Sequence, residues 1–310
     1  CAAINVRGNI CVLTTDPITA ADADMGVLSL LVTCNDLAAF GAQPVAVVAT
    51  LLAPPDAHLA AIEKLVIQME HTARELGVEI VGGHTEVTDA VRRLVISAAA
   101  LGTCHKDALI LPGGAREGDA LVMTKWAGLE GTAIIAADHQ PKLSGVLSPE
   151  ELNEALALKK SISVVKEGLL GAKNKAHAMH DVTEGGVLGA AWEIAEAAGI
   201  GVEIIADDVP VLPVTRKICS HFRIDPLKLI SSGCMLIAHP DAAKLITALN
   251  DEGIPAKVIG RFTKHKKTLI TSGKEEPLAP PEADEIFKLK QYKEKTKKSK
   301  KNKDRTPQAR

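Results

Sequence analysis

Aromatic residues are scarce in this chain of 310 residues: they make up 2% of it, whereas apolar residues together make up 46%. A core built from Ala, Val, Ile and Leu suits helices packed on sheets better than a sandwich anchored by large rings. No run of 18 or more apolar residues occurs, and the start lacks the charged-then-apolar pattern of a signal peptide. We therefore expect a soluble, cytoplasmic protein with no membrane partner.

Paired cysteines are also missing. The six cysteines are scattered, with no CxxC and no metal-ligand spacing. In a long chain without a secretory signal they are expected to be reduced and mostly structural. The chain begins at Cys1 inside a predicted strand pair, so we expect that an N-terminal segment is missing from this sequence.

Positive charge is concentrated at the C-terminal end. Residues 288–310 hold eleven Lys or Arg against two Asp or Glu and have almost no apolar residues. Such a segment is predicted to be disordered. It carries no aromatic platform or groove-reading motif, so a solubilising role is favoured over contact with nucleic acid or another acidic surface.

Strands and helices alternate along both halves of the chain. Pro112-Gly113-Gly114 marks the predicted boundary between an N-terminal domain, 1–111, and a C-terminal domain, 112–275. A tail, 276–310, follows and is predicted to be disordered at least from residue 288. The patterns predict a helix within 25–44 that is interrupted by the polar pair Asn35-Asp36. Further helices are predicted within 58–76, 131–138, 149–170, 186–198 and 241–251, and strands at 10–15, 45–54, 78–81, 92–102, 119–124, 176–179 and 201–205.

Three acids stand where an apolar element meets a turn or a polar break: Asp16, Asp36 and Asp181. Mg²⁺ prefers oxygen ligands, usually one or two carboxylates with phosphate oxygens and water. Each acid alone also has a simpler explanation. Asp181 can cap the helix that starts near Gly186, and Asp16 before Pro17 can turn the chain.

Two glycine pairs, Gly82-Gly83 and Gly185-Gly186, lie at helix–strand junctions, where backbone N–H groups can approach a phosphate. The first pair is predicted to form a turn that continues through His84, Thr85 and Glu86. Neither pair matches the P-loop or the dinucleotide fingerprint. A lone His84 is more often a turn residue than a ligand. Together with the three acids, however, the glycines suggest a phosphate–Mg²⁺ site assembled from separate loops.

Several motifs occur in an order that resembles a known superfamily. The chain reads "TTDPIT", "NDLAAFGAQP", "GGHTEVT", "HDVTEGGVLGAAWEIAEAAGIGVEI" and "DPLKLISSGCML" between residues 1 and about 272. This order resembles the aminoimidazole ribonucleotide (AIR) synthetase superfamily, and most of all its HypE-like members. The resemblance implies an α+β N-terminal domain that dimerises through its sheet, followed by an α/β C-terminal domain. An ATP cleft would lie between the domains at the interface of a homodimer.

The resemblance also implies site residues. Asp16 and Asp36 would hold Mg²⁺ with ATP, and Asp181 would complete the metal site. Residues expected to contact the nucleotide or line its site are Asn35, Gly82, Gly83, Thr85, Thr183, Gly185 and Gly186. Besides these, either His84 or Glu86 is a candidate proton acceptor beside the site.

We therefore expect an ATP- and Mg²⁺-dependent enzyme that transfers phosphate to, or activates with phosphate, a group on a small molecule or a protein. Two differences from HypE-like members imply that the reaction of HypE cannot be transferred to this chain. No cysteine follows Cys234, and Glu184 stands where HypE-type sequences tend to have Arg. The alternative is a nucleotide-binding maturation or assembly protein whose partner supplies the chemistry.

Overall fold

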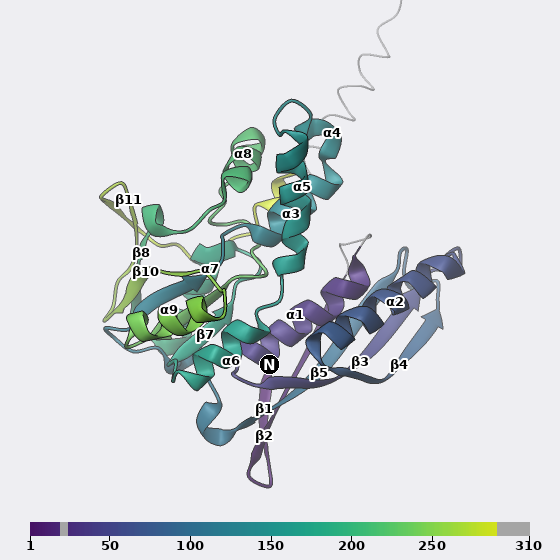
Figure 1. Cartoon of the computed structure of the whole chain (residues 1–310), viewed down its shortest axis with the longest axis horizontal. Coiled ribbons are helices and arrows are strands. Elements are labelled where there is room, and N and C mark those ends of the chain that lie inside the picture. The colour runs from purple at the N-terminus through teal and green to yellow at the C-terminus, as the bar shows by residue number, and fades with distance from the viewer. Residues whose placement is uncertain (19–23, 290–310) are drawn as a thin grey trace, which may run out of the picture.

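The computed structural model describes residues 1–18 and 24–289, which form two sheets with helices packed on them (Figure 1). The predicted architecture, an N-terminal α+β domain followed by an α/β C-terminal domain, is confirmed. Among the described residues, no helix is long and apolar enough to cross a membrane. The end of the predicted tail, 290–310, lies outside the described residues.

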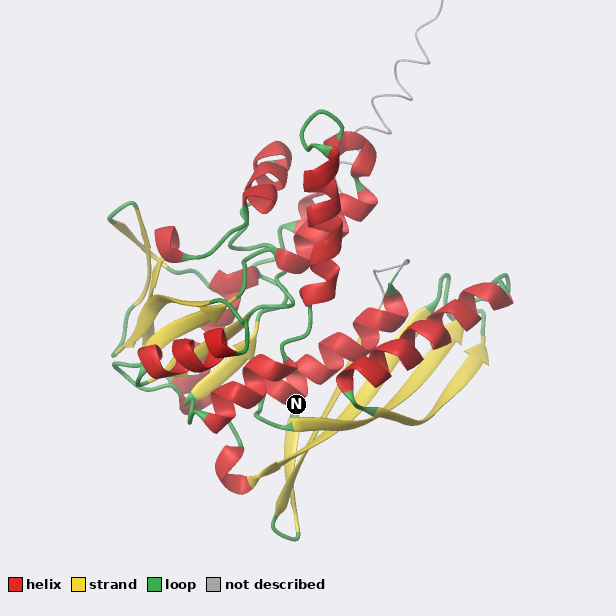
Figure 2. Ribbon diagram, viewed as in Figure 1, coloured by secondary structure: helices red, strands yellow, loops and turns green. Residues whose placement is uncertain are grey.

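The N-terminal sheet has five strands in the order β1-β2-β5-β3-β4. Their bounds are β1 (Ala2–Val6), β2 (Asn9–Ile18), β3 (Gln43–Ala53), β4 (Glu79–Val87) and β5 (Val95–His105). Only β3 and β4 run parallel. Two helices, α1 (Met25–Ala39) and α2 (Leu59–Leu76), cover one face of this sheet (Figure 2).

Alternation along the strands decides which face each side chain occupies. In β2, Ile10 and Val12 are buried, whereas Leu13, which points to the opposite face of the sheet, is 37% exposed. Period-two spacing puts Thr14 and Asp16 on the same face as Ile10 and Val12, which is the face that α1 covers. None of the described helices lies on the opposite face, which exposes apolar side chains of β1, β2 and β3.

The C-terminal sheet has seven strands in the order β12-β11-β8-β10-β6-β9-β7. Their bounds are β6 (Ala120–Thr124), β7 (Ala178–Asp181), β8 (Gly201–Ile205), β9 (Met235–His239), β10 (Ala256–Thr263), β11 (Lys267–Thr271) and β12 (Lys274–Pro277). The helices are α3 (Leu129–Asp138), α4 (Gln140–Leu143), α5 (Pro149–Ala157), α6 (Val165–Lys173), α7 (Gly186–Ala198), α8 (Pro213–Phe222) and α9 (Ala242–Asp251).

Helices cover both faces of this second sheet. Leu121 and Leu236 pack in the same cluster as α7, whereas their neighbours Val122 and Ile237 pack with α6 and α9. Alternate residues of each strand are therefore buried on opposite faces, which explains why these strands read as continuous apolar runs. A separate group, formed by α3, α5 and α8, has its own apolar cluster (Figure 1).

The two domains meet on α1. The cluster at one end of this helix joins Leu28 and Leu31 to Leu129, Leu158 and Ile162 of the second domain. At the other end, α6 comes so close that a Cβ atom on Gly168 would lie 2.2 Å from the carbonyl oxygen of Ala38. Only glycine permits this approach.

The structure corrects three local predictions. The helix predicted within 149–170 is divided into α5, a short 3₁₀ turn over Leu158–Ser161, and α6. The polar pair Asn35-Asp36 does not interrupt its helix, because α1 runs through it without a break. Residues 288 and 289, which were predicted to be disordered, lie in the described part of the chain, where Leu289 is 3% exposed and packs against the α3–α5–α8 group.

Candidate functional site

Asp16, Asp36 and Asp181 come from three elements and meet where the two domains join. Asp16 is on β2, Asp36 is on the second half of α1, and Asp181 is the last residue of β7. Burial, the charge of Asp36 and a hydrogen bond with Asp36 raise the pKa of Asp16 to about 6. Burial and the charges of Asp36 and Asp16 likewise raise the pKa of Asp181 to about 6. The three carboxyl groups therefore share one electrostatic environment.

One carboxyl oxygen in this group has no partner. Asp36 Oδ2 accepts a hydrogen bond from Thr14 Oγ1 at 2.6 Å, but Asp16 Oδ2 is buried without a hydrogen-bond partner among the described residues. An unpaired buried oxygen beside two other acids is unfavourable unless a proton or a cation joins it. Within residues 1–18 and 24–289, no three His, Cys, Asp or Glu side chains are arranged to hold a metal ion together. A cation would therefore have to draw the carboxylates together.

His180 lies next to this group. Its Nδ1 is 2.7 Å from the carbonyl oxygen of Asp181, and its Nε2 is 3.0 Å from Glu193 Oε2 on α7. Burial alone lowers the pKa of His180, but the hydrogen bond to Glu193 and the charge of Asp181 outweigh it and raise the pKa to about 9. A positive His180 adds a charge that partly offsets the three acids. No local pattern in the sequence distinguishes this histidine.

The glycine pair Gly82-Gly83 does not form the predicted turn. Strand β4 continues through Val87, and Gly83 pairs with Ala49 of β3. A Cβ atom on Gly83 would lie 2.2 Å from the carbonyl oxygen of Ala49. Gly83 therefore permits a close approach of the β3 backbone, which is one reason for a glycine inside a strand. The pairing of β3 with β4 has a bulge, in which Val81 of β4 is the extra residue.

His84 and Glu86 are not brought to the acids within one chain. Their side chains lie 3.7 Å apart (Nε2 to Oε2) and are 67% and 54% exposed. The row of paired residues that starts at Asp16 crosses β5 and β3 before it reaches Gly83 on β4. Three strand spacings separate β2 from β4 by roughly 14 Å. The Gly82–Glu86 segment, with Thr85 in it, forms an exposed edge of the sheet.

The second glycine pair does lie beside the acids. Thr183 follows Asp181 by two residues, and Gly185 and Gly186 begin α7 with φ values of +81° and +63°. A Cβ atom on Gly186 would lie 2.5 Å from the carbonyl oxygen of Leu227. The turn thus needs glycine for its conformation and for its close packing. The Gly185 N–H donates to Asp284 Oδ2 at 2.8 Å.

Asn35 has a use that the sequence did not indicate. Its side chain is 1% exposed. Its Nδ2 donates to the carbonyl oxygen of Ile162, and its Oδ1 accepts from the N–H of Val164, both at 2.8 Å. These two bonds join α1 to the loop before α6. The side chain that was expected to contact nucleotide is directed at the backbone of the second domain.

Lys125 holds the same loop from the other side. Its Nζ lies 2.7 Å from Glu167 Oε1 and donates to the carbonyl oxygens of Ser161 and Ser163 at 2.9 and 2.7 Å. Lys125 has a φ of +52°, which is uncommon for a residue with a side chain. In the sequence its only signal is a lysine directly after a buried strand. Together, Asn35 and Lys125 fix the loop 161–164 between the domains.

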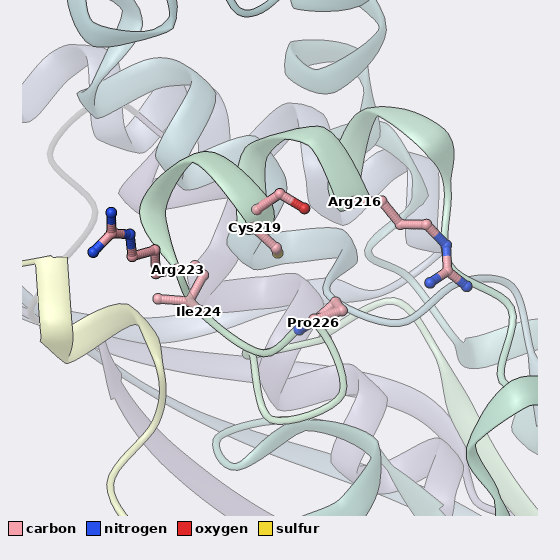
Figure 3. Close-up of a pocket in the computed structure, with 6 residues that line it drawn as sticks. Arg216, Cys219, Arg223, Ile224 and Pro226 are labelled. Atoms are coloured by element: carbon pink, nitrogen blue, oxygen red, sulfur yellow. The ribbon is translucent and has the colours of Figure 1, made fainter. Parts of the chain in front are cut away.

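A hollow on α8 lies apart from these groups. It is lined by Arg216, Cys219, Ser220, Arg223, Ile224 and Pro226. The guanidinium groups of Arg216 and Arg223 lie at opposite ends of it and point away from one another (Figure 3). Burial and the nearby acids Asp225 and Glu285 raise the pKa of the Cys219 thiol to about 12, so it is a poor nucleophile. The hollow shares no residue with the acid group.

Comparison with known proteins matches both halves of the chain. The model of the AIR synthase related protein N-terminal domain matches residues 1–104, and that of the C-terminal domain matches residues 116–272. A putative hydrogenase expression/formation protein of Methanocaldococcus jannaschii is 31% identical, over 83% of this chain and 76% of the relative. Carbamoyl dehydratase HypE of Cupriavidus necator is 29% identical, over 83% and 71%. The crystal structure of hydrogenase maturation protein HypE in complex with ATP matches with a TM-score of 0.73 at 22% identity. The match covers 93% of this chain and 89% of the HypE chain.

Proposed function

Because the chain belongs to the AIR synthase related protein family, we propose that it is an ATP-dependent enzyme that activates a nucleophile with phosphate. The acceptor is an oxygen or a similar nucleophile on a small molecule or a protein group. Relatives support the general class: one is named a carbamoyl dehydratase, and a protein of the same fold is described in complex with ATP.

The observation that carries the proposal is the group formed by Asp16, Asp36 and Asp181. Burial and the charge of Asp36 raise the pKa of Asp16, burial and the charges of Asp36 and Asp16 raise the pKa of Asp181, and Asp16 Oδ2 has no hydrogen-bond partner among the described residues. Oxygen ligands of this kind suit Mg²⁺. When bound, ATP with Mg²⁺ supplies the phosphoryl group and the charge neutralisation that its transfer requires. The chain's own part is to place the three acids close together, where a bound cation would favour their ionised form.

The N-terminal half of α7 fits the phosphates. The helix dipole favours negative charge there, and the Gly185 N–H already donates to a carboxylate oxygen, that of Asp284. Thr183 lies between this turn and Asp181 and can donate its hydroxyl to a phosphate oxygen. Asn35 supports the site indirectly in this arrangement, because its amide already bonds the backbone of residues 162 and 164.

A homodimer explains how Gly82 to Glu86 could join the site. The face of the N-terminal sheet without helices exposes large apolar residues, a feature typical of an interaction surface. By strand register they are Ile4, Val6, Leu13 and Val48. A second copy packed on this face would bring β4 of one protomer toward the acids of the other. His84 or Glu86 would then be the proton acceptor of the partner's site.

An assembly role without catalysis is the second candidate. Glu184 favours it, because this exposed acid stands within the α7 turn, where it would repel phosphate. Such a protein would bind ATP and change its affinity for a protein partner. A protein of the same fold, 24% identical to this chain, has been solved as a HypE–HypF complex, so that protein has a protein partner.

Calorimetry with MgATP tests the proposal on the full chain and on Asp16→Asn, Asp36→Asn and Asp181→Asn. We expect micromolar binding that requires Mg²⁺ and is lost in each variant. The control is Asp241→Asn, which removes the carboxylate that caps α9 and leaves the site alone. Mg²⁺-independent binding, or unchanged binding in the three variants, would contradict the proposed site. Release of ADP or AMP separates an enzyme from an assembly protein that only binds.

A further inference from the structure

The last described segment of the chain, residues 278–289, lies across the second domain and is here called the strap. Leu278 at one end is 7% exposed and packs in the cluster around α7. Leu289 at the other end is 3% exposed and packs with α3, α5 and α8. Both ends are therefore anchored by apolar burial, and the stretch between them crosses the start of α7.

The middle of the strap covers the α7 turn. Cβ atoms added to Gly185 and Gly189 would each lie 3.3 Å from Pro281 Cβ, so the proline is in contact with both glycines. Asp284 is 3% exposed. Its Oδ2 accepts from the N–H of Gly185 at 2.8 Å, and its Oδ1 accepts from the N–H of Ile286 at 2.9 Å. A negative group of the chain itself thus occupies the first amide of this helix.

The place that Asp284 occupies is otherwise acidic. Glu130 on α3 is 6% exposed, and its Oε2 has no hydrogen-bond partner among the described residues. Burial, followed by the charges of Asp284 and Glu184, raises the pKa of Glu130. Burial and the charge of Glu285 raise the pKa of Asp284, although hydrogen bonds from backbone N–H groups oppose this. The hydrogen bond to Gly185 therefore holds a carboxylate against unfavourable neighbours.

We propose that the strap is an internal competitor for phosphate: the Asp284 carboxylate takes the position at Gly185 that a nucleotide phosphate oxygen would take. Nucleotide binding then displaces Asp284 from α7, and the strap lowers the affinity for ATP. This inference rests on the proposed function, because it concerns the same site. Displacement breaks the Gly185 bond and the Pro281 contact, while Leu278 and Leu289 can keep the ends of the strap in place.

The test compares MgATP affinity by calorimetry in the full chain and in Asp284→Asn. The amide keeps the shape of the carboxylate but removes its charge, which weakens the cap on Gly185. We expect binding tighter by roughly three- to tenfold, the range that a charged cap at a helix N-terminus is worth. Asp241→Asn is the matched control, because it neutralises a capping carboxylate at α9 and should leave the affinity unchanged.

A second variant acts from the far end of the strap. Leu289→Ala loosens the anchor among α3, α5 and α8 without touching α7, and it should also tighten MgATP binding. Hydrogen exchange gives an independent readout: amides of 278–289 should exchange faster when MgATP is added to the wild-type chain, whereas those of α9 should not change. Thermal unfolding of every variant shows that the compared proteins are folded.

The outcomes distinguish a failure of the strap proposal from a failure of the proposed function. If wild type binds MgATP and folded Asp284→Asn binds equally or more weakly, the strap is not a competitor and the proposed function stands. If Asp284→Asn binds while wild type does not, the strap is a strong competitor. If wild type, Asp284→Asn and Leu289→Ala all fail to bind MgATP, the proposed function is wrong and the inference falls with it.

Discussion

Asn35→Ala should uncouple the two domains. The wild-type amide is buried and makes two hydrogen bonds of 2.8 Å to backbone groups of the second domain, the Ile162 carbonyl and the Val164 N–H. The substitution removes both bonds and leaves both groups buried without this partner. Each unsatisfied buried group costs ~1–3 kcal/mol. We therefore expect the free energy of unfolding to fall by about 3 kcal/mol, a large effect for one side chain.

The two tryptophans provide a way to see the uncoupling. Trp126 and Trp192 both belong to the second domain, so their fluorescence reports that domain alone, whereas circular dichroism reports both. In urea, wild type should give coincident transitions by the two probes. Asn35→Ala should give a circular dichroism transition that begins at lower urea than the fluorescence transition. Separate curves from different probes are the sign that two-state unfolding has broken down.

Lys125→Met supplies the comparison. It removes the other side chain that holds the loop 161–164, namely the bonds to Ser161 and Ser163 and the ion pair with Glu167. Because both side chains bind one loop, the double variant should lose less stability than the two single losses added together. A loss below about 0.5 kcal/mol for Asn35→Ala, the level of an ordinary surface change, would refute the reasoning. So would coincident transitions combined with strict additivity.

Three further outcomes are expected. Asp181→Asn should stabilise the metal-free protein by up to ~3 kcal/mol at pH 8 but hardly at pH 4. Because the pKa of Asp181 is raised to about 6, the folded state binds the proton more tightly than the unfolded state does. The stability of the wild type therefore falls as the pH rises from about 4 to 6. Urea unfolding in EDTA at both pH values measures this, and an equal effect at both would contradict it. Gly83→Ala should cost ~1–3 kcal/mol in the same assay, because its Cβ would meet a β3 carbonyl oxygen at 2.2 Å, whereas the neighbouring Gly82→Ala has room and is the control. Val48→Lys, on the exposed sheet face, should convert a dimer to a monomer in sedimentation, and an unchanged mass would exclude that face as the interface.

The sequence predicted elements well where one face or both faces of an element are buried. The helix over 58–76 is an example: Leu65, Met69 and Ala73 follow helical spacing, and Gly77 ends the helix in the left-handed conformation with φ +67°. Helix 186–198 coincides with α7 at both ends. Such elements have a repeating pattern and a terminating residue, and both are local properties of the chain.

Glycine pairs were harder to interpret, because glycine serves two needs that look alike in a sequence. Gly185-Gly186 adopts positive φ and begins a helix, as a turn requires. Gly82-Gly83 stays extended, and Gly83 is needed where two strands come close. Only the partner strand β3 distinguishes the two cases, and it lies about thirty residues earlier in the chain.

The roles of polar residues at the domain interface were also beyond local patterns. The motif "ND" pointed to both Asn35 and Asp36, but consecutive helix residues point in directions about 100° apart. Asp36 faces Thr14 on the sheet side, whereas Asn35 faces the loop 162–164. The sequence indicated that the pair matters and did not show that the two side chains do different work.

That difference makes α1 the element on which the proposed site depends. Asp16 and Asp36 belong to the first domain and Asp181 to the second, so the three acids meet only while the domains are docked. Docking is in turn held by Asn35, which precedes Asp36 by one residue. Since these acids disfavour their own proximity when ionised, the contacts of α1 must supply the free energy that keeps them together. A cation between them would reverse the sign of that term, so that ligand binding and domain docking would stabilise each other.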